Sequence, residues 1–343
     1  IIAAMLRAPT TRRRWFRTLA AAGMPALPAA PAVAQAGAAR VRIRLSHVVA
    51  RQTPKGLTLE RFRENVQQAS GGRIQVVIAP DSRLYGDTDE VQALRLGAVD
   101  MLAPSLSKFG AMGFPEFELF DLPFLFETRE QVHRITQGEV GQALLAGLSH
   151  QELVGLGYLD NGFKHMSANR ALLAPENFAG LRMRVQSSRV IAQQMRALGA
   201  RPVVLAFGET RRALALGVVD GTENPVSNFW TQRMHEAQID LSLTAHAWLG
   251  YAVVAHQRFW DHLAADDRRL VRQALGEALA WGNTIAQREN DGALAALRAS
   301  GATRTHVLSE AQRQRLREAM QPVYAGLAQP TARWLDRVRS TLG

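Results

Sequence analysis

The sequence predicts an α/β protein made of two similar lobes, and three patterns in its 343 residues support this fold class. Short apolar runs alternate with segments of helical periodicity, an order typical of parallel strands joined by helices. The octapeptide A-L-R-L-G-A-V-D at 93–100 returns as A-L-A-L-G-V-V-D at 213–220. Apolar residues also keep helical spacing over 265–299, and a helix of that length would reach about 50 Å, farther than one small lobe extends.

The first lobe begins with a strand at 41–49, where apolar residues alternate loosely with polar ones. A helix starts at Pro54, its apolar residues recur every three or four positions, and Gly71-Gly72 ends it. The next strand, helix and strand are expected at 73–79, 87–96 and 98–102. This alternation of strands and helices indicates a parallel sheet.

The second lobe repeats this order. A strand, a helix and a strand precede the second octapeptide, at 180–185, 188–198 and 201–205. Each octapeptide has the pattern of a helix end, a capping glycine and a buried strand that ends in aspartate. Helix–Gly–Val–Asp is a common device of α/β proteins, so six identities in eight positions are also compatible with chance. The shared order of the flanking elements favours two matched lobes.

Two helices are predicted in the C-terminal part of the chain. The long helix over 265–299 contains Gly282 and Gly292, either of which could kink or interrupt it. A last amphipathic helix is expected at 309–326, with Ser309 as its N-cap. Residues 329–343 carry no motif that predicts their structure.

The charge distribution argues against nucleic-acid binding. Lys and Arg number 41 against 30 Asp and Glu, a formal net charge of +11. Five of the arginines lie in residues 1–36, which contain no acidic residue, so 36 basic and 30 acidic residues remain, or +6. This excess is spread along the chain, whereas a nucleic-acid interface needs a clustered basic face. A mildly positive surface suits the attraction of small anions.

Residues 1–36 have the organisation of an export signal. T-T-R-R-R-W-F-R at 10–17 is a basic head, an Ala-rich apolar stretch reaches residue 33, and A-Q-A at 34–36 is a small-residue cleavage site. The arginines resemble a twin-arginine signal, and an ordinary secretory signal with extra arginines is the alternative. We expect cleavage near Ala36, a mature chain from Gly37, and a periplasmic location.

The sequence contains few signs of catalysis or metal binding. The chain has no cysteine, which excludes disulfides, cysteine-ligated metals and cysteine nucleophiles. G-x-S-x-G, P-loop and H-E-x-x-H motifs are missing, and Gly155-x-Gly157 lacks the third glycine of a dinucleotide fingerprint. Asp87 and Asp89 resemble the start of a calcium loop without its glycine and distal glutamate, so we interpret them as helix-capping residues. We expect no metal, no cofactor and no catalytic residue, although a Ser/His/Asp set assembled by the fold is not excluded.

Three segments carry a family resemblance: D-N-G-F-K-H-M-S-A-N-R at 160–170, G-L-R-M-R-V-Q-S-S at 180–188 and D-G-T-E-N-P-V-S-N-F-W at 220–230. They closely resemble the substrate-binding proteins of tripartite ATP-independent periplasmic (TRAP) transporters, the DctP family. The first two are most similar to its C4-dicarboxylate branch. The resemblance extends over about 42–300 and includes further motifs at 46–56, 84–91 and 119–126.

The resemblance implies a two-lobe periplasmic binding protein fold with strands that cross the hinge and a long helix that spans both lobes. We expect the lobes to comprise 37–160 with about 246–285, and 161–245 with about 286–343. The implied protein is a monomeric receptor and not an enzyme. Its partners would be a small organic anion and the small and large membrane subunits of a TRAP transporter.

The resemblance also assigns site residues in the second lobe. Arg184 would hold the ligand carboxylate, because a guanidinium presents paired donors in one plane and keeps its charge when buried. Lys164 would neutralise a second carboxylate, which is costly to bury unpaired; a solvated charge near a turn is its alternative. Asn224 matches a binding-site asparagine. Phe207 matches an aromatic that lines the site, with ordinary core packing as the alternative.

The other candidates are weaker. His47 ends the first strand, where loops of α/β sheets meet ligands, and packing near the hinge is its alternative. Ser105 follows the third strand and Pro104. The sialic-acid branch of the family tends to place an acidic residue at or near the position of Pro104, and the absence of one here favours a small simple acid as the ligand. Phe163 and Trp230 either line the cleft or pack in the core. Arg182 is expected to face solvent.

The sequence therefore predicts an extracytoplasmic solute receptor for malate, succinate or fumarate. Another carboxylate is the first alternative: a 2-oxo acid, a sugar acid or an aromatic acid. A periplasmic enzyme is a further alternative, and a receptor that signals to a membrane kinase is compatible with the same fold.

Overall fold

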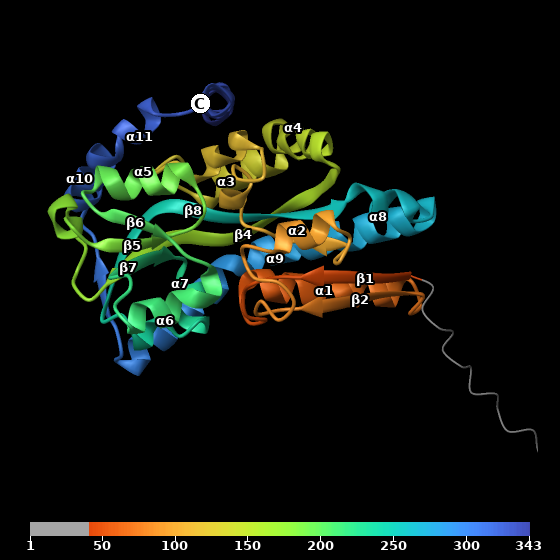
Figure 1. Ribbon diagram of the computed structural model, residues 1–343, viewed down its shortest axis with the longest axis horizontal. Helices are drawn as coiled ribbons and strands as arrows, with labels where there is room; N and C mark the ends of the chain where they lie inside the picture. Colours follow the sequence, from red (N-terminus) through yellow and green to blue (C-terminus); the bar gives the residue numbers. More distant parts are fainter. Residues whose placement is uncertain (1–40) are drawn as a thin grey trace, which may run out of the picture. The chain divides into compact units, whose positions relative to one another are not determined.

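The computed structural model describes residues 41–343, and a mixed β-sheet organises this part of the chain (Figure 1). Its strands are Val41–Ser46 (β1), Ile74–Ala79 (β2), Met101–Leu102 (β3), Leu153–Ala168 (β4), Arg182–Val185 (β5), Arg201–Val204 (β6), Gly221–Asn224 (β7), Asp240–His256 (β8) and Arg304–Val307 (β9). The spatial order is β2-β1-β3-β8-β4-β7-β5-β6, with β9 beside β8.

Two parallel sheets flank a long antiparallel pair. β1 pairs in parallel with β2 and β3, and β5 pairs in parallel with β6 and β7. Between them β4 and β8 run antiparallel to each other, with register shifts where β4 bends. We call β1–β3 with their helices the first lobe and β5–β7 with theirs the second lobe. The predicted two-lobe α/β fold with hinge-crossing strands is confirmed, whereas the residue boundaries drawn from the sequence stay a prediction.

Helices cover these sheets (Figure 1). They are Pro54–Ala69 (α1), Glu90–Arg95 (α2), Arg129–Gln137 (α3), Glu139–Gly147 (α4), Arg189–Ala197 (α5), Thr210–Ala215 (α6), Val226–Thr231 (α7), Gln257–His262 (α8), Ala265–Ser300 (α9), Glu310–Met320 (α10), Pro322–Ala325 (α11) and Gln329–Leu342 (α12). Short 3₁₀ segments include Leu106–Lys108 (η1) and Pro115–Asp121 (η2).

The first helix illustrates how local sequence sets an element. Thr53 Oγ1 accepts a hydrogen bond from the backbone N–H of Gly56 at 3.1 Å, and Pro54 occupies the first helical position, where its missing N–H is harmless. The apolar side chains that face the core are Leu59, Phe62 and Val66. The predicted start and inward face of α1 are therefore confirmed.

The long helix α9 is continuous over its 36 residues and packs against α1, β4 and α7. It thereby contacts elements of both lobes. Gly282 lies within α9 against Thr58 of α1, and a Cβ at Gly282 would stand 2.0 Å from Thr58 Oγ1. This glycine permits close approach of two helices, which is the physical reason for its place inside a helix.

The repeated octapeptides occupy equivalent places in the two lobes. Asp100 accepts hydrogen bonds from the backbone N–H of Arg44 at 2.7 Å and from its guanidinium at 3.0 and 2.7 Å. Asp220 accepts the same set from Arg182, at 2.8, 3.0 and 2.7 Å. The repeat therefore has a structural role. We call each set of three hydrogen bonds, Arg44–Asp100 and Arg182–Asp220, an Arg–Asp clamp, and the half-exposed Arg182 binds within its own lobe.

Several predicted elements differ from the structure, and the strand expected at 41–49 ends at Ser46. The helix expected at 87–96 starts only at Glu90, and the strand expected at 98–102 shortens to β3. The segment 309–326 forms two helices, with Pro322 at the start of the second because proline cannot donate to the preceding turn. Residues 329–342, which carry no motif, form α12 and pack against η2 and α3.

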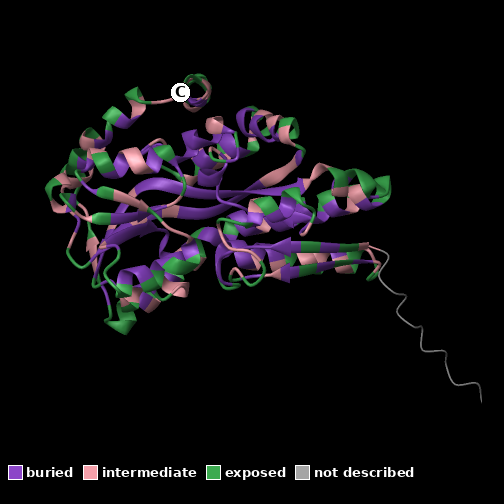
Figure 2. Ribbon diagram, in the orientation of Figure 1, coloured by how far each residue is buried: buried purple, intermediate pink, exposed green. Residues whose placement is uncertain are grey.

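The most deeply buried residues lie along the sheet. Figure 2 shows the strands largely enclosed, with exposed residues gathered on the outer faces of the helices. β8 is enclosed along most of its length because it has strands on both sides. None of the helices within residues 41–343 combines the length and apolar composition needed to cross a bilayer. The predicted export signal at 1–36 lies outside the described residues.

Candidate ligand-binding cleft

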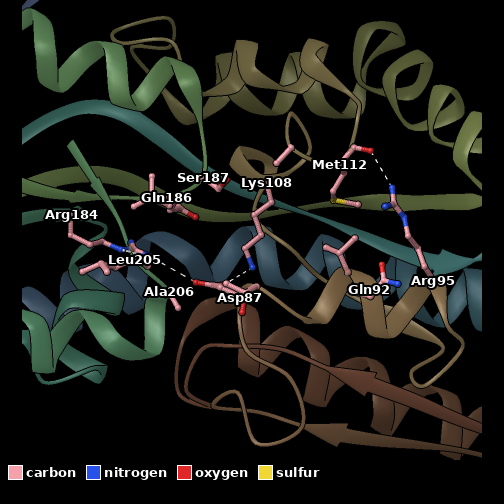
Figure 3. Close-up of a pocket in the computed structure, with 14 residues that line it drawn as sticks. Asp87, Gln92, Arg95, Lys108, Met112, Arg184, Gln186, Ser187, Leu205 and Ala206 are labelled. Carbon is pink, nitrogen blue, oxygen red and sulfur yellow. Dashed lines mark hydrogen bonds and ion pairs between the residues drawn. The ribbon is translucent and has the colours of Figure 1, made fainter. Parts of the chain in front are cut away.

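The loops after the parallel strands meet in a cleft between the lobes. It holds a small cavity of about 20 Å³ and a larger hollow of about 380 Å³ (Figure 3), and Asp87, Lys108 and Gln186 line both. The small cavity is also lined by Val48, Val49, Ser105, Phe207, Asn224, Asn228, Leu249 and Tyr251. The larger one is also lined by Thr88, Val91, Gln92, Arg95, Ala111, Met112, Arg184, Ser187, Val204, Leu205 and Ala206. Ligands of open α/β sheets bind at such positions.

Arg184 is the buried cation of the second lobe. It lies on β5, only 1% of its surface is exposed, and its Nε donates to the carbonyl oxygen of Leu205 at 3.0 Å. Its guanidinium carbon lies 5.8 Å from the centroid of the Phe207 ring. Burial lowers the pKa of the guanidinium, and the carboxylates of Asp87 and Glu223 counteract that effect. Because arginine keeps its charge in proteins, Arg184 brings a buried positive charge to the wall of the cleft.

Lys108 is the corresponding cation of the first lobe. It ends η1, after β3, and its ammonium forms ion pairs with both Asp87 and Glu90. Burial alone would lower the pKa of Lys108, but Glu90 and Asp87 together raise it above its usual value. Lys108 is therefore charged at neutral pH.

Asp87 joins the two cations. Its carboxylate contacts Lys108, accepts a hydrogen bond from the backbone N–H of Phe207, and lies 3.8 Å from Nη2 of Arg184 (Figure 3). Burial would raise the pKa of this carboxyl, but Lys108, Arg184 and the Phe207 N–H hold it below its usual range. The helix-capping role expected for Asp87 is wrong, because its oxygens face the cleft.

A polar contact also joins the lobes directly. The hydroxyl of Ser105, after β3, donates to Oε1 of Gln186, after β5, at 2.6 Å. Ser105 also forms an isolated β-bridge with Tyr251 of β8. Since the hydroxyl bonds to an amide and not to a base, it lacks the partner that would activate a nucleophile.

Four of the eight predicted site residues line these hollows: Arg184, Asn224, Phe207 and Ser105. Asn224 ends β7, as expected from the proline that follows it, and its Nδ2 contacts Thr222 Oγ1 at 3.4 Å. Phe207 opens the turn after β6. The other four predicted residues lie elsewhere.

Lys164 is enclosed inside the sheet. Its side chain has no exposed surface, and its Nζ lies 2.9 Å from Glu223 Oε2 and 3.7 Å from Asp121 Oδ1. His246 Nε2 lies 3.3 Å from the same Glu223 oxygen. Burial would raise the pKa of Glu223, but Lys164 and His246 lower it to about 2. The structure thus gives Lys164 an internal counterion and does not place it on the lining of either hollow.

His47 is fully buried, and neither ring nitrogen has a hydrogen-bond partner within the described chain. Burial and the nearby Lys55 lower its pKa to about 3, so the imidazole is neutral. Lys55 donates to the carbonyl oxygen of Ala103 at 3.0 Å and lies 3.8 Å from the ring centroid of Tyr251. His47 thus stands behind the cleft wall that its neighbour Val48 lines.

The two remaining aromatics lie outside the cleft. Phe163, on β4, is paired with Trp248 of β8 and packs against the main hydrophobic core. Trp230 stacks on His235, with ring centroids 4.3 Å apart, and lines a separate hollow between α7 and α9. These positions agree with the alternative given above for Phe163 and Trp230, in which the two side chains pack within the protein and do not line the cleft.

Sequence reasoning missed Asp87, Lys108, Gln186 and Tyr251 as cleft residues. A usable signal existed for Lys108 and Gln186, because each follows a predicted parallel strand within a few residues and strand ends of one sheet converge. Asp87 lies within the family motif at 84–91, which marks the segment, but its contacts could not be predicted because its partners come from distant segments. Within residues 41–343, no cluster of three or more His, Asp or Glu side chains is arranged to hold a metal ion.

Comparison with known proteins identifies the family. The model of bacterial extracellular solute-binding protein, family 7 (DctP), matches residues 45–330. The C4-dicarboxylate-binding periplasmic protein DctP of Rhodobacter capsulatus is 47% identical over 287 residues, which is 84% of this chain and 86% of that protein. The protein of the same name from Shewanella loihica is 39% identical over 84% and 85% of the two chains.

Solved structures agree. A TRAP periplasmic solute-binding protein from Shewanella oneidensis with bound succinate superimposes with a TM-score of 0.86 at 39% identity, covering 89% of this chain and all of the other. A protein from Pseudomonas aeruginosa with bound L-malate gives 0.81 at 35% identity, covering 83% and 99%. A sugar acid binding protein from Advenella mimigardefordensis with galactonate gives 0.83 at 27% identity, covering 88% and 98%. The chain therefore belongs to family 7 of the bacterial extracellular solute-binding proteins, the DctP family of TRAP transporter receptors.

Proposed function

We propose that this protein is the extracytoplasmic receptor of a TRAP transporter and that it binds a C4-dicarboxylate such as succinate, malate or fumarate between its lobes. The observation that carries the proposal is the position of two buried cations, Arg184 and Lys108, one on each side of the cleft. A dianion needs a cation for each carboxylate when it leaves water.

Each lobe contributes a distinct part of the proposed site. Arg184 offers a planar pair of donors that matches one carboxylate, and Lys108 offers a point charge for the other end. Ser105, Gln186 and Asn224 supply neutral hydrogen-bonding groups in the same small space. Such groups suit the remaining carboxylate oxygens and the hydroxyl of malate.

Ligand contact with both lobes explains how binding would change the receptor. A ligand that touches Arg184 and Lys108 together binds the closed form better than the open form, and so shifts the population to the closed form. We infer that the closed receptor then docks with the small and large membrane subunits in the periplasm and releases the ligand unchanged, so the protein acts as a carrier and not as an enzyme.

A different organic acid is the second candidate. The hollow of about 380 Å³ adjoins the small cavity and has room for a longer ligand than succinate. The related sugar acid binding protein with galactonate also has this fold. In this case Arg184 would keep its role and the ligand tail would occupy the hollow beside Arg95 and Met112.

Titration calorimetry on the chain from Gly37, after removal of co-purified ligand by unfolding and refolding, tests the proposal. Succinate, malate and fumarate should bind, and galactonate, butyrate and benzoate should bind at least about tenfold more weakly. Arg184→Ala should abolish binding, whereas Arg201→Ala, which removes an exposed arginine from the next strand, should not. Preference for galactonate would support the second candidate, and turnover of any of these acids would contradict the receptor function.

A further inference from the structure

Charged groups of opposite sign balance each other at the cleft. The two cations are Arg184 and Lys108. The carboxylates beside them are Asp87, which faces both, and Glu90, which contacts Lys108. These four groups together carry no net charge. A ligand with two carboxylates brings two negative charges to this space, and an unbalanced charge is costly to bury. A dicarboxylate therefore needs a further positive charge close to the cleft.

Lys55, the second residue of α1, can supply that charge. Its side chain is fully buried, and no carboxylate within residues 41–343 forms an ion pair with it. Its Nζ donates a hydrogen bond to the carbonyl oxygen of Ala103 at 3.0 Å. The other two lysines of the chain, Lys108 and Lys164, each contact carboxylates. Lys55 is thus the buried lysine to which the described protein gives no counterion.

Tyr251 connects Lys55 to the cleft. The ammonium of Lys55 lies 3.8 Å from the centroid of the Tyr251 ring, and Tyr251 lines the small cavity between the lobes. A cation is attracted to the face of an aromatic ring. It also draws electron density away from the phenol oxygen, which makes the hydroxyl a stronger hydrogen-bond donor. The positive charge of Lys55 therefore acts on the cleft through this ring.

The hydroxyl of Tyr251 is held so that it can donate. Asn161 Nδ2 donates to Oδ1 of Asn228 at 3.1 Å, which leaves the amino group of Asn228 as a donor. Burial raises the pKa of the Tyr251 hydroxyl, and the hydrogen bond from the Asn228 side chain partly counteracts that effect. A hydroxyl that accepts from one neighbour keeps its own hydrogen for another acceptor. Because Asn228 and Tyr251 line the same cavity, a carboxylate there can accept this hydrogen.

We propose that Lys55 supplies the positive charge that balances the second carboxylate of the ligand, and that it acts through Tyr251, whose hydroxyl donates to that carboxylate. This inference rests on the proposed function. Tyr251 touches the ligand, whereas Lys55 is a positioning residue that lies behind the cleft wall and strengthens the contact.

Lys55→Met and Tyr251→Phe, alone and together, test the proposal by titration calorimetry with succinate. Methionine fills the space of the lysine stem without its charge, and phenylalanine keeps the ring without the hydroxyl. Each single change should lower the affinity at least about tenfold. The double variant should lose little more than either single variant, because both changes remove the same contact. Arg51→Met is the matched control: it removes a positive charge at an exposed position four residues before Lys55 and should bind like wild type.

Each other outcome has a definite meaning. An unchanged affinity in Lys55→Met would overturn the proposal. Losses that add in the double variant would also overturn it, because Lys55 would then act independently of Tyr251. A wild type that binds no dicarboxylate would contradict the proposed function together with this inference, whereas a wild type that binds succinate no better than Lys55→Met contradicts the inference alone.

The pH dependence of binding gives a second readout, which a purely structural role of Lys55 would not produce. Burial lowers the pKa of Lys55 to about 7, although the charge of Glu90 counteracts part of this effect. The titratable groups that face Lys55 are Glu90, Asp87, Lys108, His47 and Tyr251. A bound dianion favours the charged ammonium and so raises this pKa, which couples binding to the uptake of a proton above about pH 7.

The affinity of wild type for succinate should therefore fall as the pH rises from about 7 to 9, by up to about tenfold per pH unit, and should change little just below pH 7, where Lys55 is already charged. The affinity of Lys55→Met should stay constant over the same range. A flat profile for wild type would overturn the proposal, and this measurement decides it even if Lys55→Met does not fold.

Discussion

Lys164 and Glu223 form an ion pair that solvent does not reach: Nζ and Oε2 lie 2.9 Å apart, and neither side chain has exposed surface. The two residues are on the adjacent strands β4 and β7, next to the hinge. A buried charge is tolerated when its partner is in place, and its removal leaves the other charge without compensation. This pair bears directly on the prediction that Lys164 binds the ligand.

Lys164→Met should therefore destabilise the protein rather than remove a ligand contact. Loss of the ammonium leaves the buried Glu223 carboxylate with His246 as its remaining partner, at a cost of about 3–5 kcal/mol in the free energy of unfolding. Urea unfolding measures this cost, and Lys164→Met combined with Glu223→Gln should recover part of it. An unchanged stability together with lost succinate binding would instead support the role in ligand binding predicted from the sequence.

The same network predicts a pH dependence. Burial raises the pKa of Asp121 to about 6, although Lys164 and the Ser107 hydroxyl partly counteract it. A carboxyl whose pKa is higher in the folded than in the unfolded state binds its proton more tightly when folded, so its contribution to stability falls as the pH rises from about 4 to 6.

Asp121→Asn should remove this slope, because an amide does not titrate. Relative to the variant, wild type should lose about 2–3 kcal/mol of unfolding free energy between pH 4 and pH 7. Urea unfolding at several pH values measures the difference, with Asp89→Asn as a control at an exposed carboxylate. Parallel curves for wild type and Asp121→Asn would show that Asp121 titrates normally.

Replacement of two glycines of α9 by alanine should change the stability of the protein in opposite directions. Gly282→Ala forces a methyl group against Thr58 at 2.0 Å and should lower stability by about 1–3 kcal/mol. Gly292→Ala meets no atom within 4 Å and should raise stability by about 0.4–1 kcal/mol, because alanine restricts the unfolded chain. Thermal unfolding compares the two variants, and a loss of stability in both would mean that α9 does not tolerate any Cβ on these faces.

Loss of either Arg–Asp clamp, Arg44–Asp100 or Arg182–Asp220, should affect only the lobe that contains it. Asp220→Ala removes the acceptor of the Arg182 backbone N–H and guanidinium and should cost about 1 kcal/mol, because this site is partly exposed. Hydrogen exchange should accelerate at the Arg182 amide and stay unchanged at Arg44. Asp100→Ala should do the reverse, and equal acceleration at both amides after either change would contradict the independence of the clamps.

Much of the fold follows from local patterns. The periodicity of α1, the repeated helix–Gly–Val–Asp segments and the unbroken apolar spacing of α9 each depend on neighbouring residues, so the sequence determines them. The split at Pro322 and the helix at 329–342 were missed for a different reason. The buried residues of α12, Thr331, Leu335 and Val338, have helical spacing, but they become an inner face only through packing on η2 and α3.

The candidate site likewise contains residues that the sequence could name and residues that only the tertiary structure reveals. Arg184, Asn224 and Phe207 could be named because they match positions in the family's motifs, and Ser105 because it follows a predicted strand, whose end is expected at the cleft. The sequence cannot show which lysine faces the ligand. Lys164 and Lys108 both follow apolar segments, and only the tertiary structure encloses the first with Glu223 and places the second in the cleft.

By itself, the sequence thus determined most of the elements and the two-lobe repeat, and its family motifs predicted Arg184 as the anchor for an anion. The tertiary structure alone decided which charges meet, because ion pairs such as Arg184–Asp87 join residues about a hundred positions apart, and their energies depend on distance and burial that local sequence does not specify.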